Sequence, residues 1–235
     1  MSAPVAILAG GLATRLLPVT ETIPKALVDV GGKPFVVHQL ELLRAHGIER
    51  VVLCVAHLAA QIEQVLGDGR TLGMDISYSH DGGTLLGTGG AIRRALPLLG
   101  GRFLIMYGDS YLRCDYGDVI RAFDASGKRG LMTVFRNDGQ YDASNVEFHG
   151  GRIVRYDKVE TAGMTHIDYG LGAMVPEALD GYPLDQRLDL VTVYQDLLAC
   201  DHLAGYEVGE RFYEIGSPAG LEETRRLLTR KDTDA

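Results

Sequence analysis

The 235-residue sequence contains few cysteines and no tryptophan. Cys54, Cys114 and Cys200 lie far apart and form no C-x-x-C pair, so they signal neither a disulfide framework nor a zinc site. A chain with this cysteine usage is typical of a reducing environment, and we expect a cytoplasmic location.

Positive charge is also scarce, because 23 Lys and Arg stand against 31 Asp and Glu and give a net charge of −8. Proteins that bind nucleic acid or anionic membranes need clustered Lys and Arg to neutralise phosphate. We expect neither of these partners. Any phosphate recognition must come from a few placed cations, backbone N–H groups and a metal, which suits a small anionic ligand.

Long apolar runs are absent as well. No segment approaches the length of a membrane span, and the apolar stretch Pro4–Leu8 lacks the basic leader of a signal peptide. With 46% hydrophobic residues, the chain can nevertheless bury a sizeable core. No repeat or linker divides it, so we expect one domain over residues 1–235, and the sequence leaves a homo-oligomer open.

Short apolar runs alternate with helical patterns in the first half of the chain. The expected strands are 3–8, 51–55 and 103–107, and the expected helices are 34–46, 58–66 and 88–99. This βαβ series predicts an α/β fold with a Rossmann-like, mostly parallel sheet flanked by helices. In such folds ligands bind beyond the carboxyl ends of the strands.

The second half has shorter strand patterns. Strands are expected at 130–136, 145–148 and 152–156, with Gly150-Gly151 as a hairpin turn, and helices at 189–199 and 218–229. We interpret these strands as antiparallel additions that form a lid beside the parallel sheet.

Two glycines follow the first expected strand directly, in the segment Leu8-Ala9-Gly10-Gly11. Glycine lets the backbone approach a ligand closely, and the N–H groups of such a loop can line a triphosphate. Thr14 adds a hydroxyl, Arg15 a forked cation and Lys25 a point charge. An ordinary strand-to-helix turn is the alternative, but it leaves the two cations unexplained.

Two familiar phosphate-binding motifs do not match this chain. A Walker A loop requires Ser or Thr after Gly-Lys, whereas Gly32-Lys33 is followed by Pro34. The dinucleotide fingerprint requires a third glycine where the segment that begins at Gly87 has Ile92.

The glycine loop resembles the signature of the sugar-phosphate nucleotidyltransferases, or NDP-sugar pyrophosphorylases. The matching residues are Gly10-Gly11-Leu12-Ala13-Thr14-Arg15-Leu16-Leu17-Pro18, then Pro24-Lys25 and Lys33-Pro34, with Ala13 where the family usually has glycine. The resemblance implies transfer of a nucleoside monophosphate from a nucleoside triphosphate to a sugar-1-phosphate, with Mg²⁺ as cofactor and pyrophosphate as product. The chain looks similar to short members such as heptose-1-phosphate guanylyltransferases and N-acetylmuramate-1-phosphate uridylyltransferases.

The resemblance also implies roles for individual residues. Arg15, Lys25 and Asp109 are the expected catalytic residues, of which the two cations would hold the phosphates. The expected nucleotide contacts are Leu8, Ala9, Gly10, Gly11 and Thr14, with Gly87 and Thr88 near the base.

Two carboxylates are the expected Mg²⁺ ligands. Asp109 directly follows the expected strand 103–107, where a carboxylate can bind Mg²⁺ together with substrate phosphates, and capping of the next turn is the alternative role. Glu214 stands where the family usually has aspartate, and a purely structural carboxylate is its alternative.

The acceptor residues match the family's motifs in part. Lys158 is expected to bind the acceptor phosphate, and Asn145 and Asp168 the sugar hydroxyls. The nucleotide-binding part would cover about residues 1–130, and the acceptor-binding part, with the lid, about 131–215. Two other functions stay open, a phosphocholine-type cytidylyltransferase and a non-catalytic nucleotide-sugar sensor of the same fold.

Overall fold

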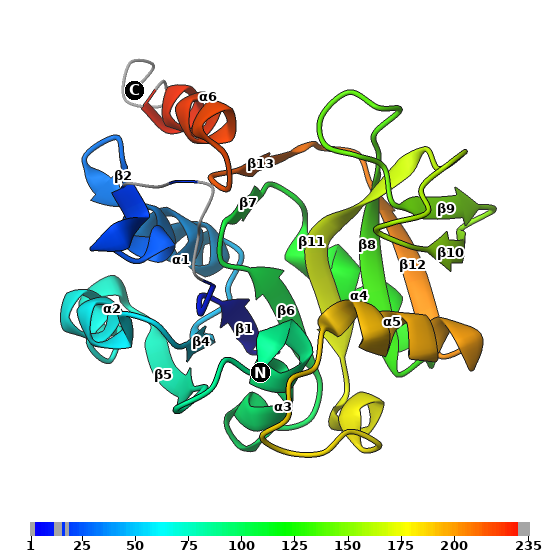
Figure 1. Ribbon diagram of the computed structural model, residues 1–235, viewed down its shortest axis with the longest axis horizontal. Helices are drawn as coiled ribbons and strands as arrows, with labels where there is room; N and C mark the ends of the chain where they lie inside the picture. Colours follow the sequence, from blue (N-terminus) through cyan, green and yellow to red (C-terminus); the bar gives the residue numbers. More distant parts are fainter. Residues whose placement is uncertain (1–2, 12–15, 17–18, 230–235) are drawn as a thin grey trace.

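The computed structural model describes residues 3–11, 16 and 19–229, and it shows a central sheet with helices packed against it (Figure 1). The strands are β1 (Val5–Leu8), β2 (Asp29–Val30), β3 (Lys33–Pro34), β4 (Arg50–Val55), β5 (Asp75–His80), β6 (Phe103–Tyr107), β7 (Ser110–Leu112), β8 (Gly130–Arg136), β9 (Val146–His149), β10 (Arg152–Tyr156), β11 (His166–Met174), β12 (Leu203–Val208) and β13 (Phe212–Glu214). The α-helices are α1 (Phe35–Ala45), α2 (Ala59–Leu66), α3 (Gly87–Leu99), α4 (Tyr116–Ser126), α5 (Leu190–Ala199) and α6 (Pro218–Thr229). Short 3-10 turns are η2 (Val19–Glu21), η3 (Lys25–Leu27), η4 (Arg70–Leu72) and η5 (Pro176–Leu179).

Nine strands form the main sheet in the order β10-β9-β11-β6-β1-β4-β5, with β8 paired to β11 and β12 paired to β8. The strands β6, β1, β4 and β5 are parallel neighbours, so their carboxyl ends meet at one edge of the sheet. β11 runs antiparallel to β6, β8 and β9, and its register with β8 shifts between Asp168 and Gly172. The parallel part and the added strands are therefore one continuous sheet.

Alternating side chains on the strands divide the core between the two faces of the sheet. Val5 and Ile7 of β1 belong to a core that includes apolar residues of α1, α2 and α4, whereas Ala6 belongs to one that includes residues of α3 and α5. A third, smaller cluster packs Phe35 of α1 with Leu221 of α6. Within the described ranges, no helix is both long enough and apolar enough to span a lipid bilayer.

The predicted α/β architecture is confirmed, and every expected strand and helix lies within two residues of an observed element. The expected hairpin turn at Gly150-Gly151 joins β9 to β10, and both glycines have positive φ. Eight strands and helices were not expected from the sequence, namely β2, β3, β5, β7, α4, β11, β12 and β13.

The added strands differ from the expected lid in two respects. β12 pairs with β8 in parallel, and β8 and β11 extend the main sheet instead of covering it. The antiparallel β9–β10 hairpin departs from this sheet through the pairing of His166 with Val146. In Figure 1 this hairpin lies on the right, on the opposite side of the molecule from α2 and β5.

Gly108 lies at the point where β6 leaves the sheet beside β1. Its N–H donates a hydrogen bond of 3.0 Å to the carbonyl oxygen of Leu8. A Cβ atom at position 108 would lie 2.5 Å from that oxygen and 3.0 Å from its carbonyl carbon. Because these neighbours are backbone atoms, they cannot turn aside as a flexible side chain could. The turn that carries Asp109 therefore requires glycine at this position.

Replacing Gly108 with alanine should lower the free energy of unfolding by about 1–3 kcal/mol, because the new methyl group overlaps the β1 backbone. For a domain of this size each kcal/mol lowers Tm by roughly 2–4 °C, which differential scanning calorimetry can measure. The matched control is Gly101→Ala at the entry to β6, where a Cβ atom meets nothing within 4 Å. If both variants melted at the same temperature, the close approach at Gly108 would not constrain the fold.

Candidate active site

Two adjoining cavities lie at the carboxyl ends of the parallel strands. The first, of about 460 Å³, is lined by Leu8, Ala9, Gly10, Gly11, Lys25, Ala26, Cys54, Asp81, Leu85, Gly87, Thr88, Ala91, Tyr107, Gly108, Asp109 and Arg187. The second, of about 430 Å³, is lined by Tyr107, Asp109, Ser110, Asp142, Ala143, Asn145, Lys158, Thr161, Ile167, Asp168, Tyr169, Gly170, Phe212 and Glu214. Tyr107 and Asp109 line both cavities and so form part of the wall between them.

The fold gathers the predicted site residues around these cavities. The first cavity contains each described residue predicted to contact the nucleotide, together with Lys25 and Asp109. The second contains Asn145, Lys158, Asp168 and Glu214, as well as Asp109. Thr14 and Arg15 lie outside the described residues. Residues from distant parts of the sequence therefore meet as two groups that share Asp109.

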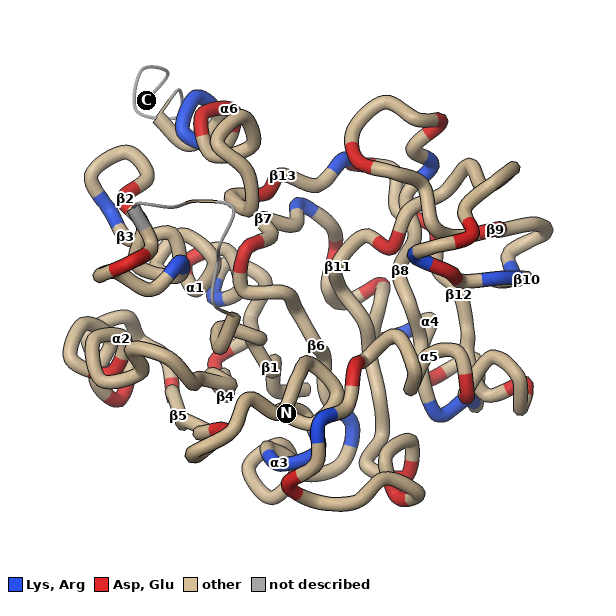
Figure 2. The backbone as a smooth tube through the Cα atoms, in the orientation of Figure 1, with Lys and Arg blue, Asp and Glu red and all other residues tan. Residues whose placement is uncertain are grey.

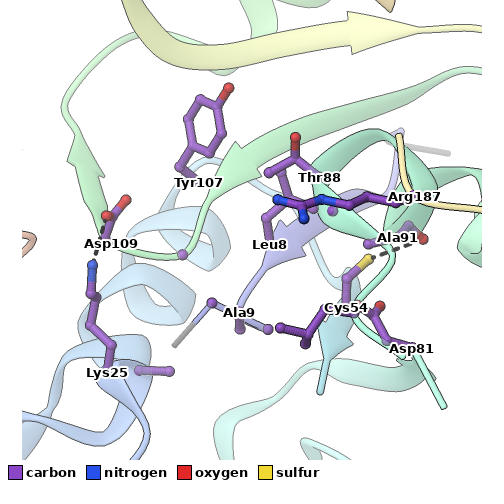
Figure 3. A pocket seen from close by; sticks show the side chains of 16 residues that line it. Leu8, Ala9, Lys25, Cys54, Asp81, Thr88, Ala91, Tyr107, Asp109 and Arg187 are labelled. Atoms are coloured by element: carbon purple, nitrogen blue, oxygen red, sulfur yellow. Dashed lines mark hydrogen bonds and ion pairs between the residues drawn. The ribbon is translucent and has the colours of Figure 1, made fainter. Parts of the chain in front are cut away.

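Lys25 and Asp109 form an ion pair at one end of the first cavity, with Nζ 3.1 Å from Oδ2 (Figure 3). Their side chains are 18% and 30% exposed, so both are partly dehydrated yet reachable from the cavity. Lys25 opens η3 directly after Pro24, whose extended backbone ends the preceding segment. The pair places a cation and a carboxylate side by side, an arrangement suited to phosphate and to a divalent metal.

Gln39 of α1 holds the turn around Asp109 from inside the core. Its amide nitrogen donates to the carbonyl oxygens of Tyr107 at 3.2 Å and of Ser110 at 2.8 Å, the residues on either side of the Gly108-Asp109 pair. Gln39 is 1% exposed, so these bonds are shielded from water. The backbone that carries the Asp109 carboxylate is thus fixed before any ligand arrives.

The glycine-rich start of α3 is bonded to the segment that leads into α5. The N–H groups of Gly89 and Gly90 both donate to the carbonyl oxygen of Leu188, at 2.9 and 3.1 Å. The hydroxyl of Thr88 donates to Asp189 and accepts from the N–H of Leu190 at the start of α5. The N–H groups of Gly89 and Gly90 are thus bonded within the protein. Gly87 and Thr88 still line the cavity.

Several lining residues of the first cavity were missed by sequence reasoning, above all Cys54, Asp81 and Arg187. Cys54 is the penultimate residue of β4, and Arg187 lies in the segment before α5, so no motif marks either of them. Burial raises the pKa of the Cys54 thiol to about 12, with a further contribution from Asp81, so this thiol stays protonated near neutral pH. Figure 3 shows Arg187 reaching over the cavity near Thr88, where it adds a cation.

Asn145 and Asp168 form a linked polar network in the second cavity. The amide oxygen of Asn145 accepts a hydrogen bond of 2.8 Å from the N–H of Asp168. The Asp168 carboxylate accepts from the N–H of Gly170 at 3.0 Å and from the Tyr156 hydroxyl at 3.2 Å. Burial raises the pKa of Asp168, while Lys158 and then these two donors lower it. The network presents oxygen acceptors, which suit the hydroxyl groups of a sugar.

Tyr107 stands between the two cavities with a buried hydroxyl that has no hydrogen-bond partner in the described part of the chain. The Lys158 ammonium lies over its ring, 5.8 Å from the centroid. Burial raises the pKa of Tyr107 well above its ordinary value, with a further contribution from Asp168, so the hydroxyl keeps its proton. It is therefore a neutral group that can donate a hydrogen bond to a ligand.

Glu214 lies at the end of β13, opposite Ser110 of β7. Its carboxylate accepts hydrogen bonds from the N–H groups of Gly216 and Ser217 and from the Ser217 hydroxyl, just before α6 begins. The side chain thus ties the start of α6 to the second cavity. Each carboxylate oxygen has two lone pairs, so this role leaves acceptor capacity for a metal.

The carboxylates of Asp109 and Glu214 fit the coordination chemistry of Mg²⁺. This hard cation prefers oxygen ligands and is usually bound by one or two protein carboxylates together with substrate phosphates and water. Asp109 lines both cavities. Ser110, the residue after Asp109, is the strand partner of Glu214 between β7 and β13. Both Asp109 and Glu214 offer carboxylate oxygens, the kind of donor that Mg²⁺ prefers.

Lys and Arg do not gather in one segment of the described chain. In Figure 2, Lys and Arg are scattered along the described chain and alternate with Asp and Glu. Among the described residues, the cations that line the two cavities are Lys25, Arg187 and Lys158. Positive charge is thus placed singly at the cavities, as expected for a small anionic ligand.

Comparison with known proteins identifies the family. Residues 5–145 match the nucleotidyl transferase family. The chain is 30% identical over 224 residues to N-acetylmuramate alpha-1-phosphate uridylyltransferase of Neisseria meningitidis serogroup B, with 94% of this chain and 96% of that protein covered. It is 30% identical over 203 residues to UTP--glucose-1-phosphate uridylyltransferase of Synechocystis sp., with 78% of this chain covered, and it spans about half (52%) of that relative's length.

Solved structures share the fold. HddC from Yersinia pseudotuberculosis has a TM-score of 0.80 and 25% sequence identity, with 97% of this chain and 100% of that chain covered. A crystal structure from Bacillus anthracis in complex with a sucrose has a TM-score of 0.85 at 18% identity, with 97% and 96% covered. The family match covers the glycine loop, Lys25 and Asp109, and the Neisseria relative matches nearly the whole chain. The chain therefore belongs to the nucleotidyl transferase family, and the resemblance drawn from its glycine loop is confirmed.

Proposed function

We propose that this protein transfers a nucleoside monophosphate from a nucleoside triphosphate to a sugar-1-phosphate and releases pyrophosphate. The observation that carries the proposal is the pair of adjoining cavities, which share Tyr107 and Asp109. The first cavity takes the triphosphate and the second takes the acceptor. Both belong to a single domain, with a nucleotide-binding part of about residues 1–130 and an acceptor-binding part of about 131–215. The free thiols of all three cysteines agree with a cytoplasmic location.

The reaction joins the two substrates at the shared wall. An oxygen of the acceptor phosphate forms a bond to the α-phosphorus, and the bond from that phosphorus to the pyrophosphate oxygen breaks, with its electron pair leaving on pyrophosphate. A phosphate monoester is largely ionised near neutral pH, so no protein base has to remove a proton. Positioning and charge neutralisation are the protein's main contributions.

Named residues supply those contributions. Lys25, with Arg15 from the glycine loop, offsets the negative charge that develops on the leaving pyrophosphate. Lys158 orients the acceptor phosphate, while Asn145 and Asp168 accept hydrogen bonds from sugar hydroxyls. Asp109, with Glu214, holds Mg²⁺, which when bound neutralises charge on the substrate phosphates. On substrate binding, Lys25 exchanges Asp109 for a phosphate oxygen.

A phosphocholine-type acceptor is the second candidate. The rings of Tyr107, Tyr169 and Phe212 line the second cavity, and a quaternary ammonium is attracted to aromatic faces. Its described lining residues also include four carboxylates, from Asp109, Asp142, Asp168 and Glu214, and one cation, Lys158. A sugar-1-phosphate is favoured, because Asn145 and Asp168 form a hydrogen-bonding network that a trimethylammonium group cannot use.

The reverse reaction tests the proposed function. Purified protein is incubated with Mg²⁺, pyrophosphate and a panel of UDP-, GDP-, ADP-, CDP- and dTDP-sugars, with CDP-choline included, and triphosphate release is measured. We expect release from a nucleotide-sugar, which identifies base and sugar together. Release from CDP-choline alone would favour the second candidate. Binding of a nucleotide-sugar without release of triphosphate would favour a sensor. In a sensor, Arg15→Ala would lower only the affinity for the nucleotide-sugar, because there is no turnover.

Metal removal should abolish turnover while leaving the fold intact. We expect excess EDTA to stop the reaction and Mg²⁺ to restore it. Asp109→Asn should lower kcat/KM roughly 100-fold or more, because it loses the charge that holds the metal.

Glu214→Gln tests whether Glu214 binds the metal or only forms hydrogen bonds with Gly216 and Ser217 before α6. If Glu214 ligates Mg²⁺, the Mg²⁺ concentration for half-maximal activity rises. The control is Glu210→Gln, an exposed glutamate that lies 3.5 Å from Arg113 and does not line the cavities. A lower Tm without Mg²⁺, together with an unchanged Mg²⁺ requirement, would show that Glu214 is structural.

Lys158→Met should raise KM for the acceptor with little effect on KM for the nucleotide. Loss of a charge-assisted contact to phosphate lowers kcat/KM for the acceptor roughly 10- to 100-fold. Initial rates measured with each substrate varied in turn separate the two constants. The matched control is Lys128→Met, whose ammonium pairs with Asp201 away from both cavities. Equal changes in both KM values would place Lys158 outside the acceptor site.

A further inference from the structure

Asp81 is a buried carboxylate in the first cavity that the reaction described above does not use. It directly follows β5 and is 7% exposed. In Figure 3 it lies at the opposite end of the view from the Lys25–Asp109 pair, with Leu8 and Ala9 between them. If the phosphates occupy the Lys25 end, the nucleoside base lies at the Asp81 end.

The carboxylate of Asp81 is incompletely paired. Oδ2 accepts a hydrogen bond of 2.9 Å from the N–H of Leu86, and within the described residues Oδ1 has no hydrogen bond. The nearby cation, Arg94, donates instead to the backbone oxygen of Asp81 and to the carboxylate of Asp185. Burial raises the pKa of Asp81, which Leu86 and Arg94 offset in part. The group therefore gains from a ligand that brings N–H donors.

The walls around Asp81 suit a flat base. Leu8, Leu85 and Ala91 contribute apolar surface, and the Cys54 thiol directs its hydrogen toward the carbonyl oxygen of Ala91. The recess thus combines apolar contacts with one acceptor group, the usual composition of a site that fixes the orientation of a small ligand.

The four common bases differ in how they meet a carboxylate, which only accepts hydrogen bonds when ionised. Guanine presents two adjacent donors on its Watson–Crick edge, the ring N1–H and the N2 amino group, which match the two oxygens of a carboxylate. Uracil and thymine present one N–H between two carbonyl oxygens, and these oxygens repel it. Adenine and cytosine present an amino donor beside a ring nitrogen that is a hydrogen-bond acceptor, so only one of their two groups can bond to a carboxylate.

We propose that Asp81 reads the base and makes the first cavity selective for guanine nucleotides over uridine and thymidine nucleotides. This inference rests on the proposed function, because it assumes that the first cavity holds the nucleotide. Asp81 accepts the two N–H groups of guanine, and the bond from Leu86 holds the carboxylate in place for them.

Nucleotide binding to the unaltered protein is the first test. Isothermal titration calorimetry with Mg²⁺ and GTP, ITP, UTP or dTTP should give GTP the highest affinity, roughly tenfold or more above UTP and dTTP. ITP lacks the N2 amino group but is otherwise GTP, so it should bind several-fold more weakly than GTP. UTP or dTTP binding as tightly as GTP would overturn the proposal.

Asp81→Asn tests the residue itself. The amide oxygen can still accept from Leu86, while the amide NH₂ faces the guanine donors, so GTP should lose at least tenfold in affinity and its advantage over ITP should vanish. The matched control is Asp68→Asn, which also accepts a backbone N–H, from Arg70, but lies outside the cavity. An equal loss for all four nucleotides would mean that Asp81 only shapes the loop. The comparison of GTP with ITP needs no variant, so it tests recognition of the guanine amino group even if Asp81→Asn fails to fold.

Turnover separates this inference from the proposed function. Selective GTP binding without release of triphosphate from any nucleotide-sugar would retain the base assignment and reject the enzymatic one. Release of triphosphate from UDP- or dTDP-sugars but not from GDP-sugars would retain the enzymatic function and reject the assignment of guanine.

Discussion

The site depends on the parallel pairing of β1 with β4 and β6. The N–H of Ala9 donates to the carbonyl oxygen of Cys54 at 2.9 Å, and that of Gly108 to Leu8 at 3.0 Å, so the three strands stay paired to their ends. Because the strands are parallel, the chain leaves all of them at one edge of the sheet. The described part of the glycine loop and Asp109 therefore meet at this edge. A slip of one residue would turn every side chain of a strand to the opposite face.

Three partly or fully buried carboxylates differ in how far the protein satisfies them. Burying a charge is costly unless it is paired or hydrogen-bonded. Asp109 has the ammonium of Lys25 and the Ser110 hydroxyl, and Asp168 has the Gly170 N–H and the Tyr156 hydroxyl. Asp81 has one backbone N–H. A ligand that supplies N–H donors stabilises most the carboxylate that has the fewest partners in the protein. Of these three carboxylates, Asp81 therefore best suits a neutral ligand with several donors.

Sequence reasoning recovered the features that are local in the chain. The apolar runs of β1, β4 and β6, the helical spacing of α1 to α3, and the Gly10-Gly11 and Asp109 positions each carry their signal within a few residues. The missed features depend on distant partners. The carbonyl oxygen of Leu188 accepts hydrogen bonds from the N–H groups of Gly89 and Gly90. Arg187, from the same segment, lines the cavity, although this segment follows α3 by roughly 100 residues in the sequence. The parallel pairing of β12 with β8 is likewise a choice of partner that strand propensity does not encode.

The division of the site explains why the two halves of the chain resemble the family to different degrees. Among the described lining residues the two cavities share Tyr107 and Asp109 alone, so substitutions around the second cavity can alter the acceptor without moving the phosphate-binding loop. Under the proposed function, the glycine loop serves the triphosphate whatever the acceptor is, and it matches the family signature closely. Asn145, Lys158 and Asp168 would serve one acceptor only, and their surroundings match the family's motifs in part. The Tyr107 hydroxyl is buried and has no hydrogen-bond partner among the described residues, and it lies where the two proposed substrates would meet.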